Sequence, residues 1–221
     1  MFVHPPGDRA EIVFDGTECV FDSLFVGHSG TVPVRGRGCG AVPHLLFRIY
    51  SIGGLMDLSA ELINQATWKI PNALALVGSR AGAEWNAMTT SWITQVAQEP
   101  VLIGVGIDTA AITHRLIAEG GSFTVNLWDA RDTRPFVKFS KPAKKDGMTL
   151  NGFAISEGET GAPIFDEAIA WLECSVNQTV DCGSHTFFIG ELVAAGVNDD
   201  DARAAAMSDT RMKYGGTRRG H

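Results

Sequence analysis

The stretch ALALVGSRAGAEWNAMTTSWITQVAQEPVLIGVGI, residues 73–107, decides the fold class. It contains three runs rich in Val, Ile, Leu and Thr, at 73–80, 87–97 and 101–107, and the turn-type segments AGAEWN and QEP separate them. Short runs of β-branched and apolar residues between turn residues favour strands. Three sequential strands joined by tight turns predict an antiparallel meander.

Similar signals continue along the chain. Residues 108–121, DTAAITHRLIAEGG, predict a helix with Asp108 or Thr109 as its N-cap and the glycine pair as its end. The polar stretch 129–147 predicts a short helix followed by a mobile loop. Six or more strands around one core, with short helices only at the margins, predict a mainly β protein with an antiparallel barrel. The further strands are expected at 122–128, near 168–182 and at 185–197.

The first 55 residues differ from the rest. They mix Gly, Pro and Arg with short apolar islands and show no sustained helical or strand period. From Met56 onward the local signals agree, beginning with Ser59 as the cap of a short amphipathic helix. We therefore expect residues 1–55 to be an extension upstream of a native start at Met56, with an additional strand or arm as the alternative. Residues 56–221 form the main domain.

The composition excludes several classes of function. The formal net charge of −7 lacks the basic surplus of a nucleic-acid binder. No apolar run reaches the roughly 18 residues of a membrane span. The cysteines form no CxxC pair and have no histidine cluster nearby, so neither a rubredoxin-type iron site nor a zinc site is expected. Reduced thiols in a cytoplasm are the expectation for this chain. The four cysteines are Cys19, Cys39, Cys174 and Cys182.

Polar side chains are concentrated on two of the predicted strands. Hydroxyl and amide groups near a few Lys or Arg side chains provide the charge-assisted hydrogen bonds that a phosphate ester needs. The alternative is the ordinary solvated side of a half-buried strand. The polar residues are Asn86, Thr89, Thr90 and Ser91 on one strand and Thr124 and Asn126 on the other, and the basic loop downstream carries Arg134, Lys138, Lys141, Lys144 and Lys145.

Several motifs in order resemble the flavin reductase-like, FMN-binding split-barrel family, which includes flavoredoxin-type and ferric reductase-type proteins. The motifs are NAMTTSW, QEPVLIGVGI, GSFTVNLW, APIFDE, WLECSV and GSHTFFIGEL, and they run from about residue 68 to residue 197. The resemblance does not cover residues 1–55. It implies a homodimer of six-stranded antiparallel split barrels, each binding one FMN in a groove near the subunit interface.

The resemblance also assigns flavin-binding residues. The NAMTTSW segment would line the isoalloxazine ring and the ribityl chain, the FTVN strand would flank the flavin, and two loop residues would contact its phosphate. These residues are Asn86, Ala87, Met88, Thr89, Thr90, Ser91 and Trp92, then Phe123, Thr124, Val125 and Asn126, and finally Ser140 and Lys141.

The resemblance implies an NAD(P)H-dependent flavin reductase that passes a hydride to FMN and then to free flavin, a ferric chelate or a partner oxygenase. His185 is a possible nicotinamide contact, but Ser184 stands where many members have Asp before this histidine. Two alternatives stay open. One is a flavoredoxin-like electron-transfer flavoprotein without its own substrate, and the other is a split-barrel reductase that uses F420.

Overall fold

The computed structural model describes residues 10–14, 17–21, 59–213 and 215–217, and the chain divides into two units, Met1–Met56 and Asp57–His221. Within the first unit, strands β1 (Ala10–Phe14) and β2 (Thr17–Phe21) form an antiparallel pair. The sequence of this region has no regular period, although the Asp-Gly dipeptide between the two strands is a known hairpin signal. The expected start at Met56 concerns residues that lie mostly outside the described ranges and stays a prediction.

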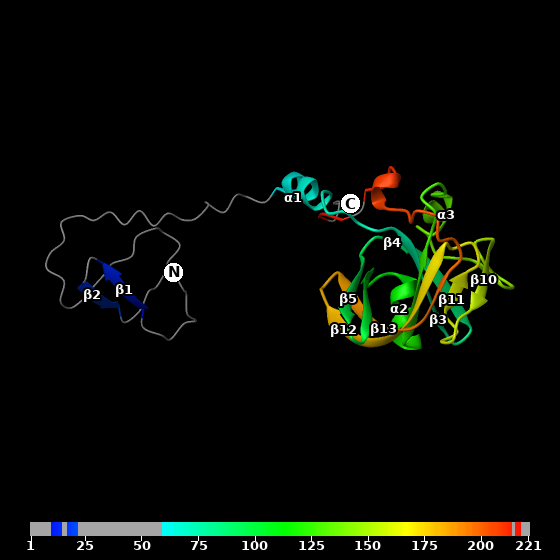
Figure 1. Ribbon diagram of the computed structural model, residues 1–221, viewed down its shortest axis with the longest axis horizontal. Helices are drawn as coiled ribbons and strands as arrows, with labels where there is room; N and C mark the ends of the chain where they lie inside the picture. Colours follow the sequence, from blue (N-terminus) through cyan, green and yellow to red (C-terminus); the bar gives the residue numbers. More distant parts are fainter. Residues whose placement is uncertain (1–9, 15–16, 22–58, 214, 218–221) are drawn as a thin grey trace. The chain divides into compact units, whose positions relative to one another are not determined.

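The second unit is built on a seven-stranded antiparallel sheet with the strand order β4-β3-β7-β12-β13-β6-β5 (Figure 1). All pairings between neighbours in this order are antiparallel. The strands are β3 (Ala75–Ala81), β4 (Glu84–Thr90), β5 (Ile93–Gln98), β6 (Val101–Asp108), β7 (Ser122–Leu127), β12 (Ala170–Asp181) and β13 (His185–Val197).

A two-residue corner closes this sheet into a barrel. The expected strand at 87–97 is interrupted, because β4 ends at Thr90 and β5 begins at Ile93. These two strands lie at opposite edges of the sheet order, so the corner at Ser91 and Trp92 brings the two edges together. The Gly106 N–H on β6 donates to the Trp92 carbonyl oxygen at 2.9 Å. Counted as one bent strand, β4 and β5 reconcile the seven strands with the six that were expected.

A smaller four-stranded antiparallel sheet covers part of the barrel. From the sequence we expected only a loop in the first part of this region. Its strands were not predicted, because they are too short to show a period. Three helices and one 3-10 turn complete the described part of this unit. The small sheet consists of β8 (Lys145–Asp146), β9 (Thr149–Leu150), β10 (Phe153–Glu157) and β11 (Pro163–Phe165); the other elements are α1 (Ala60–Thr67), α2 (Ile112–Gly120), α3 (Arg134–Lys138) and η1 (Met207–Asp209).

Strand β3 separates two apolar cores. Ala75 and Val77 face the barrel core, which is filled by side chains from β6, β7, β12, β13 and α2. Leu74 and Leu76 face a second core. Period-two alternation explains how one strand serves both cores. The second core contains Trp85 and Ala87 of β4, Trp128, Phe136 and Phe139 near α3, and Leu150, Ile155 and Phe165 of the small sheet.

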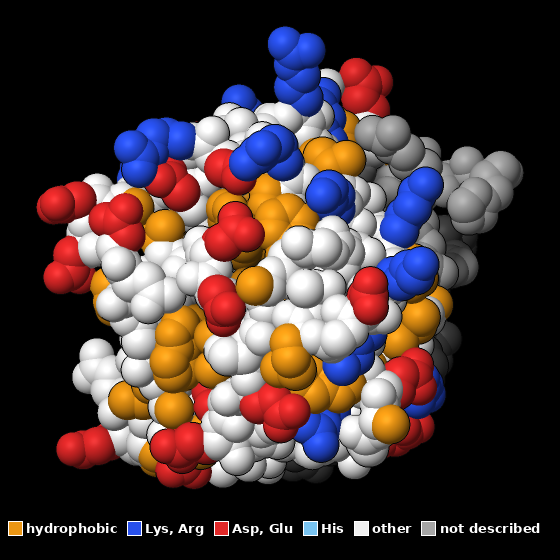
Figure 2. Space-filling model, turned by 90° about the vertical axis from the view of Figure 1, so that its right-hand side faces the viewer, with side chains coloured by type: hydrophobic (Ala, Val, Ile, Leu, Met, Phe, Trp, Pro, Cys, Tyr) orange, Lys and Arg blue, Asp and Glu red, His pale blue; other side chains and the backbone are white. Residues whose placement is uncertain are grey.

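The surface over the small sheet carries mixed charge. In Figure 2 acidic and basic side chains are interspersed on this face, with apolar groups between them.

Helix α1 begins where expected, with Ser59 Oγ accepting a hydrogen bond from the Leu62 N–H at 3.2 Å. It lies beside the C-terminal segment, since Trp68 Nε1 donates to the Gly215 carbonyl oxygen at 3.3 Å (Figure 1). Among the described residues, no helix is long and apolar enough to cross a membrane.

Candidate functional site

A cleft of about 580 Å³ opens at the end of β4. Its walls come from β4 and the barrel corner, from the start of α2, from α3 with the loop that follows it, and from the C-terminal segment. Segments far apart in the sequence therefore meet here. The lining residues are Leu74, Asn86, Met88, Thr89, Thr90, Ser91, Ala110, Ala111, Ile112, Thr113, Phe136, Phe139, Ser140, Lys141, Pro142, Met207, Met212 and Lys213.

Ser91 stands out in this cleft because its hydroxyl has no partner. The residue is only 2% exposed. In the part of the chain that the structure describes, Ser91 Oγ is the one buried side-chain oxygen or nitrogen without a hydrogen-bond partner. A buried polar group left in this state costs about 1–3 kcal/mol. Such a group calls for a specific explanation, and an absent ligand is one.

The other polar side chains of β4 are occupied within the protein. Thr89 Oγ1 donates to the Phe136 carbonyl oxygen at 2.8 Å, and the Thr89 N–H donates to the Phe139 carbonyl oxygen at 3.0 Å. These bonds fasten α3 to β4. Thr90 Oγ1 donates to the Gly106 carbonyl oxygen at 3.4 Å and links the corner to β6. Both hydroxyls stabilise the walls of the cleft.

Asn86 is also engaged on both sides of its amide. Its Nδ2 donates to Thr113 Oγ1 at 2.8 Å, and its Oδ1 accepts from the Ala143 N–H at 2.7 Å. Through these two hydrogen bonds Asn86 connects the start of α2 with the loop after α3. Asn86 is only 4% exposed, so the connection is buried.

Helix α2 begins later than the sequence predicted. The expected N-cap, Asp108 or Thr109, is wrong, because the helix starts at Ile112 with Ala111 as its N-cap and without a side-chain cap. Asp108 Oδ1 instead accepts from the Ala110 N–H at 2.9 Å in the preceding turn. Within the described ranges, no group accepts the N–H of Ile112 or Thr113. The positive end of the helix dipole, with two available N–H groups, therefore borders the cleft.

Lys141 is the member of the predicted basic loop that lines the cleft, together with its neighbour Ser140. Other members point elsewhere. Arg134 pairs with Asp132, whose pKa is lowered by hydrogen bonds from that guanidinium. The ammonium groups of Lys138 and Lys145 lie over the rings of Phe153 and Trp85, at 4.8 and 4.7 Å from the ring centroids.

The structure places Ala87 and the β7 residues away from the cleft. Ala87 is buried in the second core, and Phe123 and Val125 are buried in the barrel core. Thr124 Oγ1 donates to the Pro163 carbonyl oxygen at 2.5 Å. Asn126 Nδ2 donates to the Leu76 carbonyl oxygen at 3.2 Å, and its Oδ1 accepts from the Phe165 N–H at 2.9 Å. These polar groups join the small sheet to the barrel.

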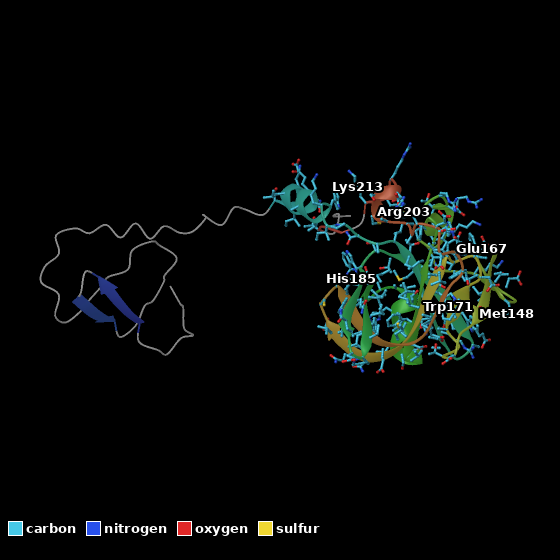
Figure 3. The ribbon with its side chains drawn as sticks, viewed as in Figure 1. Met148, Glu167, Trp171, His185, Arg203 and Lys213 are labelled. Atoms are coloured by element: carbon cyan, nitrogen blue, oxygen red, sulfur yellow. The ribbon has the colours of Figure 1, made fainter. Side chains whose placement is uncertain are left out.

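Trp92 and His185 lie together beside the corner, outside the set of cleft-lining residues. Their ring centroids are 4.6 Å apart and the rings are tilted by 56°. His185 begins β13 at the barrel end shown in Figure 3, and its Nδ1 lies 3.0 Å from Ser184 Oγ. Trp92, the residue after Ser91, therefore packs its ring against His185.

The C-terminal segment contributes residues that the sequence analysis did not single out. Met207 and Met212 line the cleft, and the signal was weak because this segment shows no period. Ala206 bridges to Ala73 next to β3. Asp209 forms an ion pair with Arg203 at 2.8 Å, and hydrogen bonds from this guanidinium lower the pKa of Asp209 to about 2. Figure 3 labels Arg203, which precedes the 3-10 turn η1, and Lys213, which follows it.

A family model described as flavin reductase like domain matches residues 67–217, well over half of the chain. The chain belongs to the flavin reductase like family. The matched range contains every element of the cleft.

Two of the curated relatives carry reductase names. The chain is 29% identical to the ferric-chelate reductase (NAD(P)H) of Archaeoglobus fulgidus over 158 residues, covering 70% of this chain and 93% of that protein. It is 30% identical to the NADH-dependent FAD reductase of Streptomyces globisporus over 117 residues, 52% of this chain and 64% of that protein. It spans only 55% of the length of the high molecular weight rubredoxin of Moorella thermoacetica, at 32% identity over 130 residues that cover 56% of this chain.

Solved structures confirm the mainly β, split-barrel fold class that was expected. The NADH:FAD oxidoreductase of Streptomyces globisporus C-1027, in complex with NAD and FAD fragments, superposes with a TM-score of 0.61 at 23% identity, covering 71% of this chain and 93% of that one. The flavin reductase component of a bacterial two-component tryptophan halogenase gives a TM-score of 0.57 at 26% identity, with 64% and 89% covered.

Proposed function

We propose that the cleft binds FMN and that the chain is a flavin reductase, an oxidoreductase that takes a hydride from NADH or NADPH. Membership of the flavin reductase like family supports a flavin as the ligand. The single observation that carries the proposal is the Ser91 hydroxyl, buried in the cleft without a partner. A ring nitrogen or oxygen of the flavin would accept its hydrogen bond.

The residues present fit this cofactor at both of its chemical extremes. The ring system is large, flat and aromatic, and the cleft offers Met88, Phe136, Phe139, Met207 and Met212 to pack against its faces. The phosphate is anionic, and the cleft offers the uncapped start of α2 and Lys141. Ser140 also lines the cleft, but its hydroxyl already donates to the Val137 carbonyl oxygen at 2.7 Å. A helix N-terminus and a lysine are common phosphate partners.

The chain's own contribution to the reaction is position and environment. Flavin supplies the hydride-accepting chemistry when bound. The Ser91 O–H would hold the ring in one orientation, and the apolar walls would exclude water from it. His185, packed on Trp92, would contact the nicotinamide at the neighbouring surface. Orientation of the two reactants is the main barrier-lowering effect available to a site that has no protein nucleophile.

The electron acceptor is proposed from the named relatives. A ferric chelate is named for the Archaeoglobus fulgidus protein and FAD for the Streptomyces globisporus protein. A flavin reductase that belongs to a two-component halogenase is among the solved structures. Free flavin, a ferric chelate or a partner oxygenase is accordingly proposed for this chain.

We also propose a cytoplasmic homodimer. Apolar side chains at the surface support an interface, including Ile70, which is 59% exposed, and Val197, which is 63% exposed. Sedimentation of the purified protein tests the dimer, and a monomer at micromolar concentration would contradict it.

Anaerobic stopped-flow mixing tests the function. Protein loaded with FMN is mixed with NADH or NADPH, and the flavin absorbance is followed. The proposal expects bleaching by at least one nicotinamide and multiple turnovers with excess free flavin or ferric chelate. A protein that gains no flavin on titration with FMN or FAD would contradict it. The same titrations decide between FMN and FAD.

A second candidate is an electron-transfer flavoprotein without its own substrate. Ser184 favours it, because a serine replaces the aspartate that many members carry before this histidine. This alternative predicts bound flavin that neither nicotinamide reduces and that a partner protein does reduce. Use of F420 instead of a flavin would be recognised from the absorption and fluorescence of the bound cofactor.

A further inference from the structure

Asn86 joins two walls of the cleft at its polar end. Its amide nitrogen donates to Thr113 Oγ1 at the start of α2, and its amide oxygen accepts from the Ala143 N–H in the loop that carries Ser140 and Lys141. The start of α2 and this basic loop are therefore held on either side of the same buried side chain. Groups suited to an anion meet there from two directions.

The backbone sets the direction of these hydrogen bonds. The Ala143 N–H can only donate, so the Asn86 oxygen must face it and the Asn86 nitrogen must face Thr113. Thr113 Oγ1 therefore acts as an acceptor toward Asn86, and its own proton must point in another direction. No group in the described part of the chain accepts that proton, and Thr113 lines the cleft.

Three hydrogen-bond donors thus gather at the first turn of α2. They are the N–H groups of Ile112 and Thr113 and the Thr113 hydroxyl, which is fully buried. The helix dipole adds partial positive charge at the same point. Ser91 supplies independent evidence for a ligand in this cleft, since its hydroxyl is 98% buried and has no partner.

We propose that the Thr113 hydroxyl donates a hydrogen bond to the phosphate of the bound flavin, and that Asn86 is a positioning residue that orients this donor. The inference rests on the proposed function, because it names the group that binds one part of the same cofactor. Asn86 itself is not a flavin contact in this assignment. Its amide is engaged with Thr113 and Ala143, and it acts on the phosphate through Thr113 and through the loop.

FMN and riboflavin separate this role from a merely structural one, because riboflavin lacks the phosphate. Binding of both is measured for the intact wild-type protein, Thr113→Val and Thr113→Ser. We expect Thr113→Val to weaken FMN binding about tenfold, the loss of one hydrogen bond to a charged group. Riboflavin binding should be unchanged, and Thr113→Ser should restore FMN binding because it keeps the hydroxyl.

Thr160→Val is the matched control. It also removes a threonine hydroxyl that is hydrogen-bonded to another side chain, in this case to Glu173 Oε1 at 2.6 Å, on an exposed residue away from the cleft. Both valine variants should lower the melting temperature, but only Thr113→Val should change the ratio of FMN to riboflavin affinity. An unchanged ratio in Thr113→Val would overturn the proposal.

A double-mutant cycle tests Asn86. Asn86→Ala should weaken FMN binding in the wild-type background and weaken it less in the Thr113→Val background, because the donor that it orients is then already absent. Fully additive losses would overturn the positioning role. If Asn86→Ala does not fold, the Thr113 variants still decide whether the donor reaches the phosphate. Wild-type protein that binds neither flavin would instead contradict the proposed function itself.

Discussion

Strand β7 and the corner that follows β4 carry similar polar side chains and use them in opposite ways. On β7, Thr124 and Asn126 are completely buried, and they bond to each other and to the backbone of β3 and β11. At the corner after β4, Ser91 is also buried but unpartnered, and it borders a cleft. Polar residues on a barrel strand therefore do not define a binding site by themselves. The difference lies in whether the protein already supplies their hydrogen-bond partners.

The largest expected effect is on the β7 side of this comparison. Asn126→Ala leaves the Phe165 N–H and the Leu76 carbonyl oxygen without their side-chain partner in the interior. We expect the free energy of unfolding to fall by about 3 kcal/mol. Urea denaturation measures this, and FMN titration of the folded protein should give an unchanged affinity. Lost FMN affinity with full stability would place β7 in the binding site.

Ser91→Ala is the corresponding test on the β4 side. Because no protein group bonds this hydroxyl, we expect the unfolding free energy to change by less than about 0.5 kcal/mol. FMN affinity should fall about tenfold, the upper range for one hydrogen bond. The matched control is Ser79→Ala, another buried serine, whose Oγ donates to the Ser122 carbonyl oxygen at 2.8 Å. That control should lose about 1 kcal/mol of stability and keep its FMN affinity.

The sequence predicts the local elements of this fold better than the hydrogen-bond partners of its polar side chains. The run at 73–107 predicted the strands, and Ser59 predicted the start of α1, because period and capping are local properties. The bend at Ser91 was not predicted, because a strand that crosses from one sheet edge to the other keeps its β-branched composition. Asn126 is a residue type that often contacts ligands. Only the packing of β11 against β7 shows that its side-chain oxygen already accepts a hydrogen bond from the Phe165 N–H.

The start of α2 shows the same limit at short range. Asp108 is a good N-cap residue, yet its carboxylate is used in the preceding turn and the helix begins uncapped at Ile112. Thr113 consequently gained a role that its position in the expected helix did not suggest. Met207 was not predicted to line the cleft. It is placed there by the β-bridge between its neighbour Ala206 and Ala73, and a single bridge leaves no period in the sequence.

Cys174 lies in the barrel core, where it pairs in register with Phe123 of β7, and its burial predicts a low thiol reactivity. Burial and then the nearby Glu173 charge raise the pKa of the Cys174 thiol to about 12. Iodoacetamide at mildly alkaline pH should therefore modify the exposed Cys182 and spare Cys174, as peptide mass spectrometry would show. Rapid alkylation of Cys174 in the folded protein would contradict the packing described for this core.

The same pKa shift predicts a pH dependence of stability. The folded-state pKa is raised, so the stabilisation by the neutral thiol is complete below the ordinary thiol pKa of 9.0 and is lost as pH rises toward about 12. Urea unfolding at a series of alkaline pH values measures the decline, and Cys174→Ala should remove this part of it.

The smallest expected effect concerns the C-terminal wall of the cleft. Asp209→Asn weakens the ion pair with Arg203 and so loosens the turn that carries Met207. We expect FMN affinity to fall only about twofold, because exposed ion pairs contribute little. Because the pKa of Asp209 is lowered to about 2, this contact should persist at neutral pH and be lost only as pH falls toward that value. A large loss of affinity would make this wall more important than Ser91.

The most direct test of the central claim is a crystal structure of the protein with FMN. We expect the flavin in the cleft between β4, the start of α2 and the C-terminal segment, with a flavin atom within about 3.2 Å of Ser91 Oγ. Thr124 and Asn126 should keep their bonds to the protein. A flavin bound elsewhere, with Ser91 Oγ still without a partner, would contradict it.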